Sequence, residues 1–173
     1  MGFFGIHHVT FTVPSLGEAC DRARAHGYWI VGYDDSDPEW KEAFLHPREA
    51  LGIVVQFAEP GAPTSGEHPP GWRPPPGPAH PPPPVTILGL RMRARSRERA
   101  DTQWGAIIQG SRAADADGVL VYRWPGSFLR ITVEIDPDSE EGPVAIDYTS
   151  ARGAVLPDEP HLVLGAVFRR SID

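Results

Sequence analysis

The chain has 173 residues, of which 40% are hydrophobic and 23% are charged. This length allows one compact domain, or two small modules that share a core, and excludes two large independent domains. The net charge of −7 is the wrong sign for a protein that binds the phosphate backbone of nucleic acids.

Three further features bear on the setting of the protein. No apolar run reaches the roughly 20 residues that a membrane helix needs, so we expect no membrane partner. The first residues lack the basic start and long apolar stretch of a signal peptide. The single cysteine, Cys20, excludes an internal disulfide framework and a cysteine-cluster metal site, and we therefore expect a cytoplasmic location.

The first half begins with an alternating segment, residues 6–13, which predicts a strand. Ser15, followed by Glu18 three residues later, forms a capping box that predicts the start of a helix, and Gly27 ends that helix. Its apolar positions follow the spacing i, i+3, i+4, i+7: Leu16, Ala19, Cys20 and Ala23. Three further strands are predicted at residues 28–33, 42–45 and 51–57.

A proline-rich stretch separates this half from the next. Residues 60–84 contain 12 of the 20 prolines, and proline cannot join a helix interior or the middle of a sheet. We expect an extended polyproline II spacer between two modules. The alternative, a ligand for a proline-recognising domain, is less favoured.

The order of elements then recurs. Residues 87–94 predict a strand, and Ser96 opens a helix that Gly110 closes. Residues 118–124 and 128–135 predict a hairpin, residues 144–148 another strand, and residues 162–168 a final edge strand or cover.

The pattern is an internal repeat. Both halves read β-α-β-β-β, although their sequences have diverged. We therefore predict an α+β fold in which residues 1–59 form one module, residues 60–84 a linker, and residues 85–173 a second module with a C-terminal extension.

Candidate site residues follow from strand alternation in the first half. The apolar residues of the 6–13 strand pack under the helix, which turns His8, Thr10 and Thr12 to the opposite face. The same reasoning places Gln56 on that face. An imidazole and an amide oxygen can both bind a divalent metal, although a single strand histidine is more often an ordinary polar residue.

A family resemblance rests on three segments. They are GIHHVTFTV at residues 5–13, AFLHP at residues 43–47 and GIVVQFAEP at residues 52–60. Together they resemble the vicinal oxygen chelate superfamily of glyoxalases, bleomycin-resistance proteins and dioxygenases. The resemblance is closest to methylmalonyl-CoA epimerase-like members, and it covers mainly the first 60 residues.

The resemblance implies a fold in which the two modules form a curved mixed sheet around a cavity, and it also implies a chemistry. In that superfamily the first and last strands of each module offer ligands to a divalent metal, which stabilises an enolate-like intermediate while side chains move protons. By position, His8 matches the first-strand ligand and Gln56 the last-strand ligand. The metal would be Mn, Co, Ni, Zn or Fe, and it would be absent in a member that only binds ligands.

The second half departs from this pattern. Gly89 stands where the resemblance requires a histidine. In the 144–148 strand, a gapless alignment places Ile146 opposite Gln56, whereas alternation of the apolar residues turns Asp147 into the cavity. We favour Asp147, because an unpaired carboxylate under a helix is costly. It then becomes a third metal ligand or a catalytic base, with an exposed edge-strand aspartate as the alternative.

Two arginines of the second half occupy strand positions that correspond to two threonines of the first half. Arg91 and Arg93 correspond to Thr10 and Thr12, and an arginine in the cavity could clamp a substrate carboxylate or phosphate. Thr10, Thr12, Arg91 and Arg93 are therefore the predicted substrate-binding residues. The alternative for the arginines is an ion pair with Glu134.

Two classes of function remain open. The first is a metal-dependent epimerase, isomerase or lyase that acts on a small oxo-acid or thioester. The second is a metal-free protein that binds or sequesters a small molecule, such as a drug or natural product. Ring-cleaving dioxygenase chemistry is less favoured, because it needs two histidines and a carboxylate. A homodimer is also expected, because modules of this superfamily pair between chains as well as within one. The order of the modules also allows a permuted or truncated form of the superfamily's chain.

Overall fold

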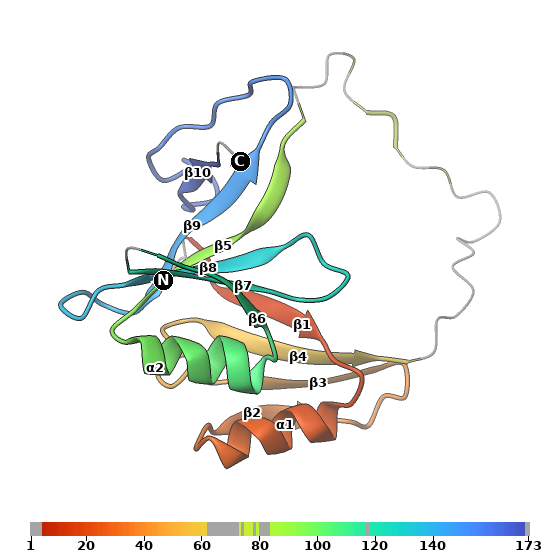
Figure 1. Ribbon diagram of the computed structural model, residues 1–173. Helices are drawn as coiled ribbons and strands as arrows, with labels where there is room; N and C mark the ends of the chain where they lie inside the picture. The colour runs from red at the N-terminus through yellow and green to blue at the C-terminus, as the bar shows by residue number, and fades with distance from the viewer. Residues whose placement is uncertain are drawn as a thin grey trace.

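The structure is a computed structural model, and it describes residues 5–61, 73, 75–77, 79, 84–116 and 118–171. Most of the predicted linker, residues 60–84, therefore lies outside the described residues. The described residues form a four-stranded sheet, a six-stranded sheet and the helical segments that pack on them, as Figure 1 shows. None of the helices among the described residues is long and apolar enough to span a lipid bilayer.

The first module is a four-stranded sheet with one helix. Its strands lie in the order β1-β4-β3-β2, with β1 parallel to β4 and the other neighbours antiparallel. The elements are β1 (His8–Thr12), α1 (Leu16–Ala25), β2 (Ile30–Asp34), β3 (Trp40–Leu45) and β4 (Val54–Pro60). All of these elements were predicted from the sequence, with boundaries that differ by a few residues.

Helix α1 begins where the capping residues predict. The hydroxyl of Ser15 accepts a hydrogen bond from the backbone N–H of Glu18 at 3.3 Å. The carboxylate of Glu59, on β4, accepts a second one from the N–H of Leu16 at 2.6 Å. The expected apolar stripe is buried: Leu16, Ala19, Cys20 and Ala23.

The second module repeats this topology inside a larger sheet. The six-stranded sheet has the order β10-β9-β5-β8-β7-β6, and β5-β8-β7-β6 has the same strand directions as β1-β4-β3-β2. The strands are β5 (Thr86–Ala94), β6 (Ser111–Ala116), β7 (Val119–Arg123), β8 (Arg130–Ile135), β9 (Gly142–Thr149) and β10 (Phe168–Arg170). The helical segment comprises α2 (Arg97–Ala100) and a π-helix, η1 (Asp101–Ile107).

Two sequence predictions for this half need correction. Strand β6 was missed, because SRAADA lacks the β-branched and aromatic residues that mark a strand. As a result, residues 144–148 were taken as the last strand of the repeat. The position equivalent to β4 is instead occupied by β8, which is parallel to β5, whereas β9 adds to the other side of β5 in antiparallel orientation.

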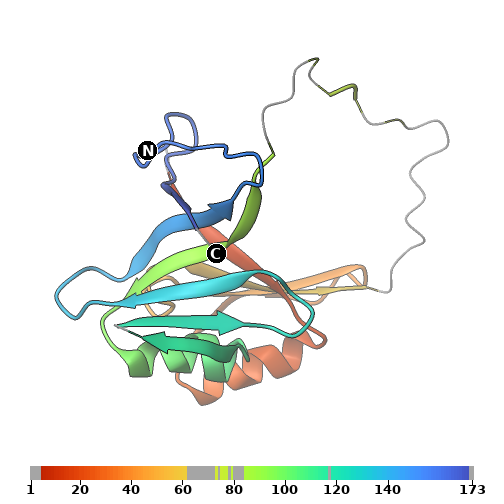
Figure 2. The ribbon, with the colours of Figure 1, turned by 45° about the horizontal axis from the view of Figure 1, so that its top comes forward.

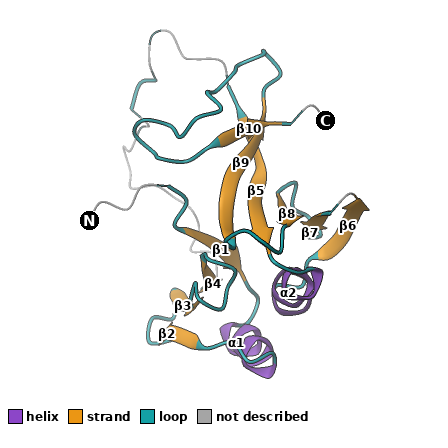
Figure 3. Cartoon of the chain, turned by 90° about the vertical axis from the view of Figure 1, so that its left-hand side faces the viewer, coloured by secondary structure: helices purple, strands orange, loops and turns teal. Residues whose placement is uncertain are grey.

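One hydrophobic core joins the two modules. It includes Leu16 and Cys20 of α1, Trp104 and Ile107 of η1, and buried residues from both sheets. Figures 2 and 3 show α1 and the α2–η1 segment lying side by side on the same side of the molecule. The chain is therefore one folding unit, although its repeat is visible in the sequence.

Candidate functional site

A cavity of about 540 Å³ lies where the two modules meet. It runs along β1 of the first sheet and is bordered by β5, β8, β9 and the loop between β7 and β8. Most of its wall is apolar: Ile6, Val9, Phe11, Ile87, Leu90, Trp124, Pro125, Leu129, Ile131 and Ile146. The remaining lining residues are His8, Thr10, Thr12, Gly89, Ser127 and Arg130.

Three of the predicted site residues line this cavity. His8, Thr10 and Thr12 alternate along β1 and have exposed side chains, as their place opposite the helix face predicts. The ring of His8 makes an edge-to-face contact with that of His7, with centroids 5.7 Å apart. Because β1 is an edge strand, residues of both of its faces reach the cavity.

Gln56 lies beside these residues in a hydrogen-bonded row. It pairs with Thr10 in the register of β1 and β4. Its amide oxygen accepts a hydrogen bond from the Thr10 hydroxyl at 2.7 Å, and its amide nitrogen donates one to the Glu42 carboxylate at 2.7 Å. Glu42 also accepts a hydrogen bond from the indole of Trp40 at 3.0 Å. Both ends of the Gln56 amide are therefore occupied.

Glu42 was missed by the sequence analysis. Glu42 and Gln56 share a sheet face, because Glu42 lies two residues from Phe44 and Phe44 pairs with Gln56. Placing it required the register between β3 and β4, which the sequence alone did not supply.

Asp147 faces away from the helices, as expected, but it does not line this cavity. Leu90 and Ile146 are partners across β5 and β9, and both line the cavity. The neighbouring residues Arg91 and Asp147 alternate to the other face of the sheet. The apolar alternation that was taken to face the helix therefore brings Ile146, and not Asp147, to the cavity.

The carboxylate of Asp147 is buried in an ion pair. Arg91 binds it with two parallel hydrogen bonds, at 3.0 and 3.1 Å, and the residue is 1% exposed. The Thr132 hydroxyl donates a further hydrogen bond at 3.4 Å. Burial lowers the pKa of Arg91, but hydrogen bonds and charge from Asp147 and Glu134 outweigh it and raise the pKa above its usual value. This carboxylate is not placed to act as a base in the cavity.

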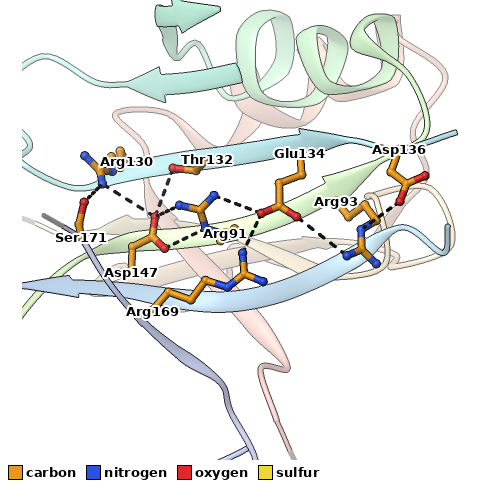
Figure 4. A network of polar contacts seen from close by, with 9 residues as sticks. All are labelled: Arg91, Arg93, Arg130, Thr132, Glu134, Asp136, Asp147, Arg169 and Ser171. Atoms are coloured by element: carbon orange, nitrogen blue, oxygen red, sulfur yellow. Dashed lines mark hydrogen bonds and ion pairs between the residues drawn. The ribbon is translucent and has the colours of Figure 1, made fainter. Parts of the chain in front are cut away.

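The pair belongs to a larger network on that face, shown in Figure 4. Glu134 accepts hydrogen bonds from Arg91 at 3.2 Å and from Arg169 at 2.9 Å. Arg93 lies 3.9 Å from Glu134 and 3.9 Å from Asp136. Arg91 therefore forms the ion pair that was the alternative interpretation, and neither Arg91 nor Arg93 lines the cavity.

The donor set does not fit the divalent metal that the resemblance implies. Of the three predicted ligands, Asp147 is held by Arg91 on the second sheet, outside the cavity, and the Gln56 oxygen already accepts a hydrogen bond from Thr10. Among the described residues, no cluster of three or more His, Cys, Asp or Glu side chains could hold a metal ion. The metal stays a prediction from the resemblance, and the chemistry of these donors argues against it.

The sequence analysis also missed the far wall of the cavity. Trp124, Leu129 and Arg130 come from the loop and strand that follow β7. The guanidinium of Arg130 donates to the Ser171 hydroxyl at 2.8 Å and lies 3.9 Å from the Asp147 carboxylate. The Pro125-Gly126 turn was a visible signal for this loop, but nothing in the sequence placed the loop opposite β1.

Comparison with solved structures identifies the fold. The chain matches a catechol 2,3-dioxygenase with a TM-score of 0.55 and 14% identity, over 84% of this chain and 51% of that one. It matches BphC, a halotolerant catechol dioxygenase, with a TM-score of 0.50 and 12% identity, over 84% of this chain and 51% of that one. A hypothetical protein from Staphylococcus aureus matches with a TM-score of 0.59 and 9% identity, over 95% of this chain and 65% of that one.

These matches bear on architecture. The chain spans about half the length of the two dioxygenases and about two thirds of the staphylococcal protein. No protein-family model and no curated protein matches the sequence. The chain has the α+β, curved-sheet architecture of the vicinal oxygen chelate fold.

Proposed function

We propose that this protein binds a small apolar molecule in the cavity along β1, without a metal. The observation that carries the proposal is the cavity itself, whose volume of about 540 Å³ lies within the range of about 300–1,000 Å³ typical of ligand pockets. Burial of apolar ligand surface against its largely apolar wall would drive binding.

The few polar groups of the wall support a ligand with one hydrogen-bonding group. His8 is exposed toward the cavity, and a neutral imidazole can both donate and accept a hydrogen bond. Thr10 and Thr12 lie on the same strand. The one charged lining residue among those described, Arg130, already contacts Asp147 and Ser171. A neutral ligand therefore fits this cavity better than an anion.

A cavity-filling variant tests the proposal. N-phenyl-1-naphthylamine is a neutral apolar dye that fluoresces in apolar surroundings, and we expect the wild-type protein to bind it. Ile87 lines the cavity and is 40% exposed, so Ile87→Trp should fill the space with little effect on the core. We expect this variant to bind the dye at least tenfold more weakly.

A neighbouring residue provides the matched control. Val85 is 38% exposed and does not line the cavity, so Val85→Trp adds the same indole outside the site. Dye affinity should be unchanged in Val85→Trp. Equal affinities in the two variants, or no dye binding by the wild-type protein, would contradict the proposal.

The second candidate function is a metal-dependent epimerase, isomerase or lyase that acts on a small oxo-acid or thioester. It is favoured by one observation, the position of the exposed His8 beside Gln56 on one sheet face. It also follows the sequence resemblance to methylmalonyl-CoA epimerase-like proteins. It requires Gln56 to bind the metal with the lone pair of its oxygen that Thr10 does not use, and a third donor to be found, for example from a second copy of the chain in a homodimer.

Metal analysis separates the two candidates. The protein would be purified without an affinity tag or chelator and compared with His8→Ala by elemental analysis, with its mass in solution measured at the same time. Near-stoichiometric Mn, Co, Ni, Zn or Fe that disappears in His8→Ala would support the enzyme. Metal content below a tenth of an equivalent in both proteins, with no thermal shift on adding these ions, would support the binding protein.

A further inference from the structure

A second cavity, of about 350 Å³, lies between α1 and η1. Arg22, on α1, is the one charged residue among the described residues that line it. The rest of the wall is largely apolar: Phe11, Val13, Pro14, Phe57, Ile107, Ile108, Trp124 and Pro125, with Thr12 and Gln109. Figure 3 shows the two helical segments side by side at this place.

The charge of Arg22 has no acidic partner among the described residues. Other partly buried arginines, Arg91, Arg93 and Arg130, each have a carboxylate within 4.0 Å. Arg22 has one hydrogen bond, from its Nε to the carbonyl oxygen of Ile107 at 3.3 Å. A partly buried charge that lacks a partner is costly, and the cost is removed when an anion binds.

Capping of the π-helix explains part of this arrangement. The carbonyl of Ile107 lies at the end of η1, where a side-chain donor and a positive charge are both favourable. This contact uses one of the five N–H donors of a guanidinium. The two terminal nitrogens of Arg22, which form the fork that matches a carboxylate, make no hydrogen bond or ion pair with any described residue.

A second feature of the same wall is the backbone of Gln109. Its φ is 60°, in the left-handed region that a non-glycine residue seldom adopts. This conformation ends the helical segment and brings residue 109 to the cavity that contains Arg22. Gln109 therefore contributes a polar residue to the wall of the cavity that contains Arg22.

We propose that this second cavity binds an organic acid with an aryl or short alkyl body. The carboxylate pairs with the terminal nitrogens of Arg22, which can bind it in a bidentate manner. The body packs against Phe57, Ile108 and Trp124. The site is distinct from the cavity along β1, although the two share Phe11, Thr12, Trp124 and Pro125 as walls.

A pair of nearly isosteric probes tests the charge requirement. Phenylacetate and 2-phenylacetamide differ in charge but hardly in shape, and their binding to the full chain can be followed by NMR titration. Because a hydrogen bond to a charged group contributes more than one to a neutral group, we expect phenylacetate to bind at least tenfold more tightly. In Arg22→Gln the preference should disappear.

Arg24→Gln is the matched control. Arg24 lies on the same helix and pairs with Asp21 at 2.9 Å, on the exposed surface, so its loss changes the net charge equally. The preference for phenylacetate should survive in this variant. A wild-type protein without preference, or a preference that survives in Arg22→Gln, would overturn the proposal.

Two further measurements locate and define the ligand. Nuclear Overhauser contacts between the phenyl protons and the methyl groups of Val13, which lines the second cavity and not the first, are expected in the wild-type protein. They keep the proposal testable if Arg22→Gln does not fold, and their absence from the bound complex would overturn it. Inorganic phosphate should bind at least tenfold more weakly than phenylacetate, and equal binding would show a simple anion site instead.

Discussion

The two modules share a topology but use the corresponding sheet face differently. Ser15 and Ser96 cap their helices, and counting back seven residues from each aligns His8 with Gly89 and Thr10 with Arg91. This alignment also makes Gln56 and Thr132 equivalent, because Thr10 pairs with Gln56 and Arg91 pairs with Thr132. The first module presents a short hydrogen-bonded row of Thr10, Gln56 and Glu42 on this face, whereas the second is filled by an ion-pair network (Figure 4).

The strand added after the repeat explains the difference. Strand β9 covers the edge of β5 and supplies Asp147 to Arg91, whereas the corresponding edge of β1 has no strand partner in its sheet and borders the cavity. The same position is therefore used for stability in one module and remains accessible to a ligand in the other. A duplicated module need not keep both copies of a site.

The largest expected effect comes from breaking the network in the second module. Asp147→Ala removes the buried carboxylate from the partly buried guanidinium of Arg91, which keeps Glu134 as a partner. The loss should therefore be about 3 kcal/mol, the lower end of the cost of breaking a buried ion pair. Urea unfolding should show this loss. Thr10→Val, at the equivalent position of the first module, should cost less than about 1 kcal/mol, and equal losses would contradict the division of roles.

The second largest loss of stability is expected at Gly89, the position of the second module that is equivalent to His8. Gly89 has a φ of 152°, and a Cβ there would lie 1.8 Å from the carbonyl oxygen of Arg130. No side chain fits without moving the backbone, so Gly89→Ala should destabilise the protein by about 1–3 kcal/mol. An unchanged urea midpoint for this variant would mean that a histidine ligand could have been accommodated.

The smallest expected effect is specific to the first module and depends on pH. Glu59 caps α1, whereas the equivalent position of β8, three residues beyond Thr132, is Ile135. The hydrogen bond from the Leu16 N–H, and then Lys41, lower the pKa of Glu59 below its usual 4.5.

The sign of the pH effect follows from the lowered pKa. The contribution of Glu59 is fully present above the pKa of the unfolded chain and is lost as the pH falls through the folded-state pKa. Wild-type protein should therefore lose more stability between pH 6 and pH 3 than Glu59→Gln, as followed by urea unfolding at each pH. Equal losses of stability in the two proteins would contradict the capping role of Glu59.

Local patterns predicted much of this fold. The capping residues Ser15 and Ser96 and the apolar stripe of α1 marked both helices, and alternation along β1 placed His8, Thr10 and Thr12 correctly. Tertiary pairing was less accessible. Strand β6 carries weak strand formers, and without it β9 was taken for the last strand of the repeat, which matched Asp147 with Gln56 although it lies beside Arg91.

The walls of both cavities depend on contacts between elements far apart in the sequence. Trp124 meets Phe11, with ring centroids 5.1 Å apart, and Arg22 reaches Ile107 across the two modules. No local periodicity encodes such contacts, because they follow from how the modules pack. Neither Trp124 nor Arg22 was therefore singled out from the sequence.

The most direct test of the central claim, that the cavity along β1 binds apolar ligands without a metal, is a titration with N-phenyl-1-naphthylamine before and after exhaustive dialysis against EDTA. We predict the same affinity in both samples and after adding back Mn²⁺, Zn²⁺ or Fe²⁺. Binding that is lost on chelation and restored by one of these ions would contradict the account.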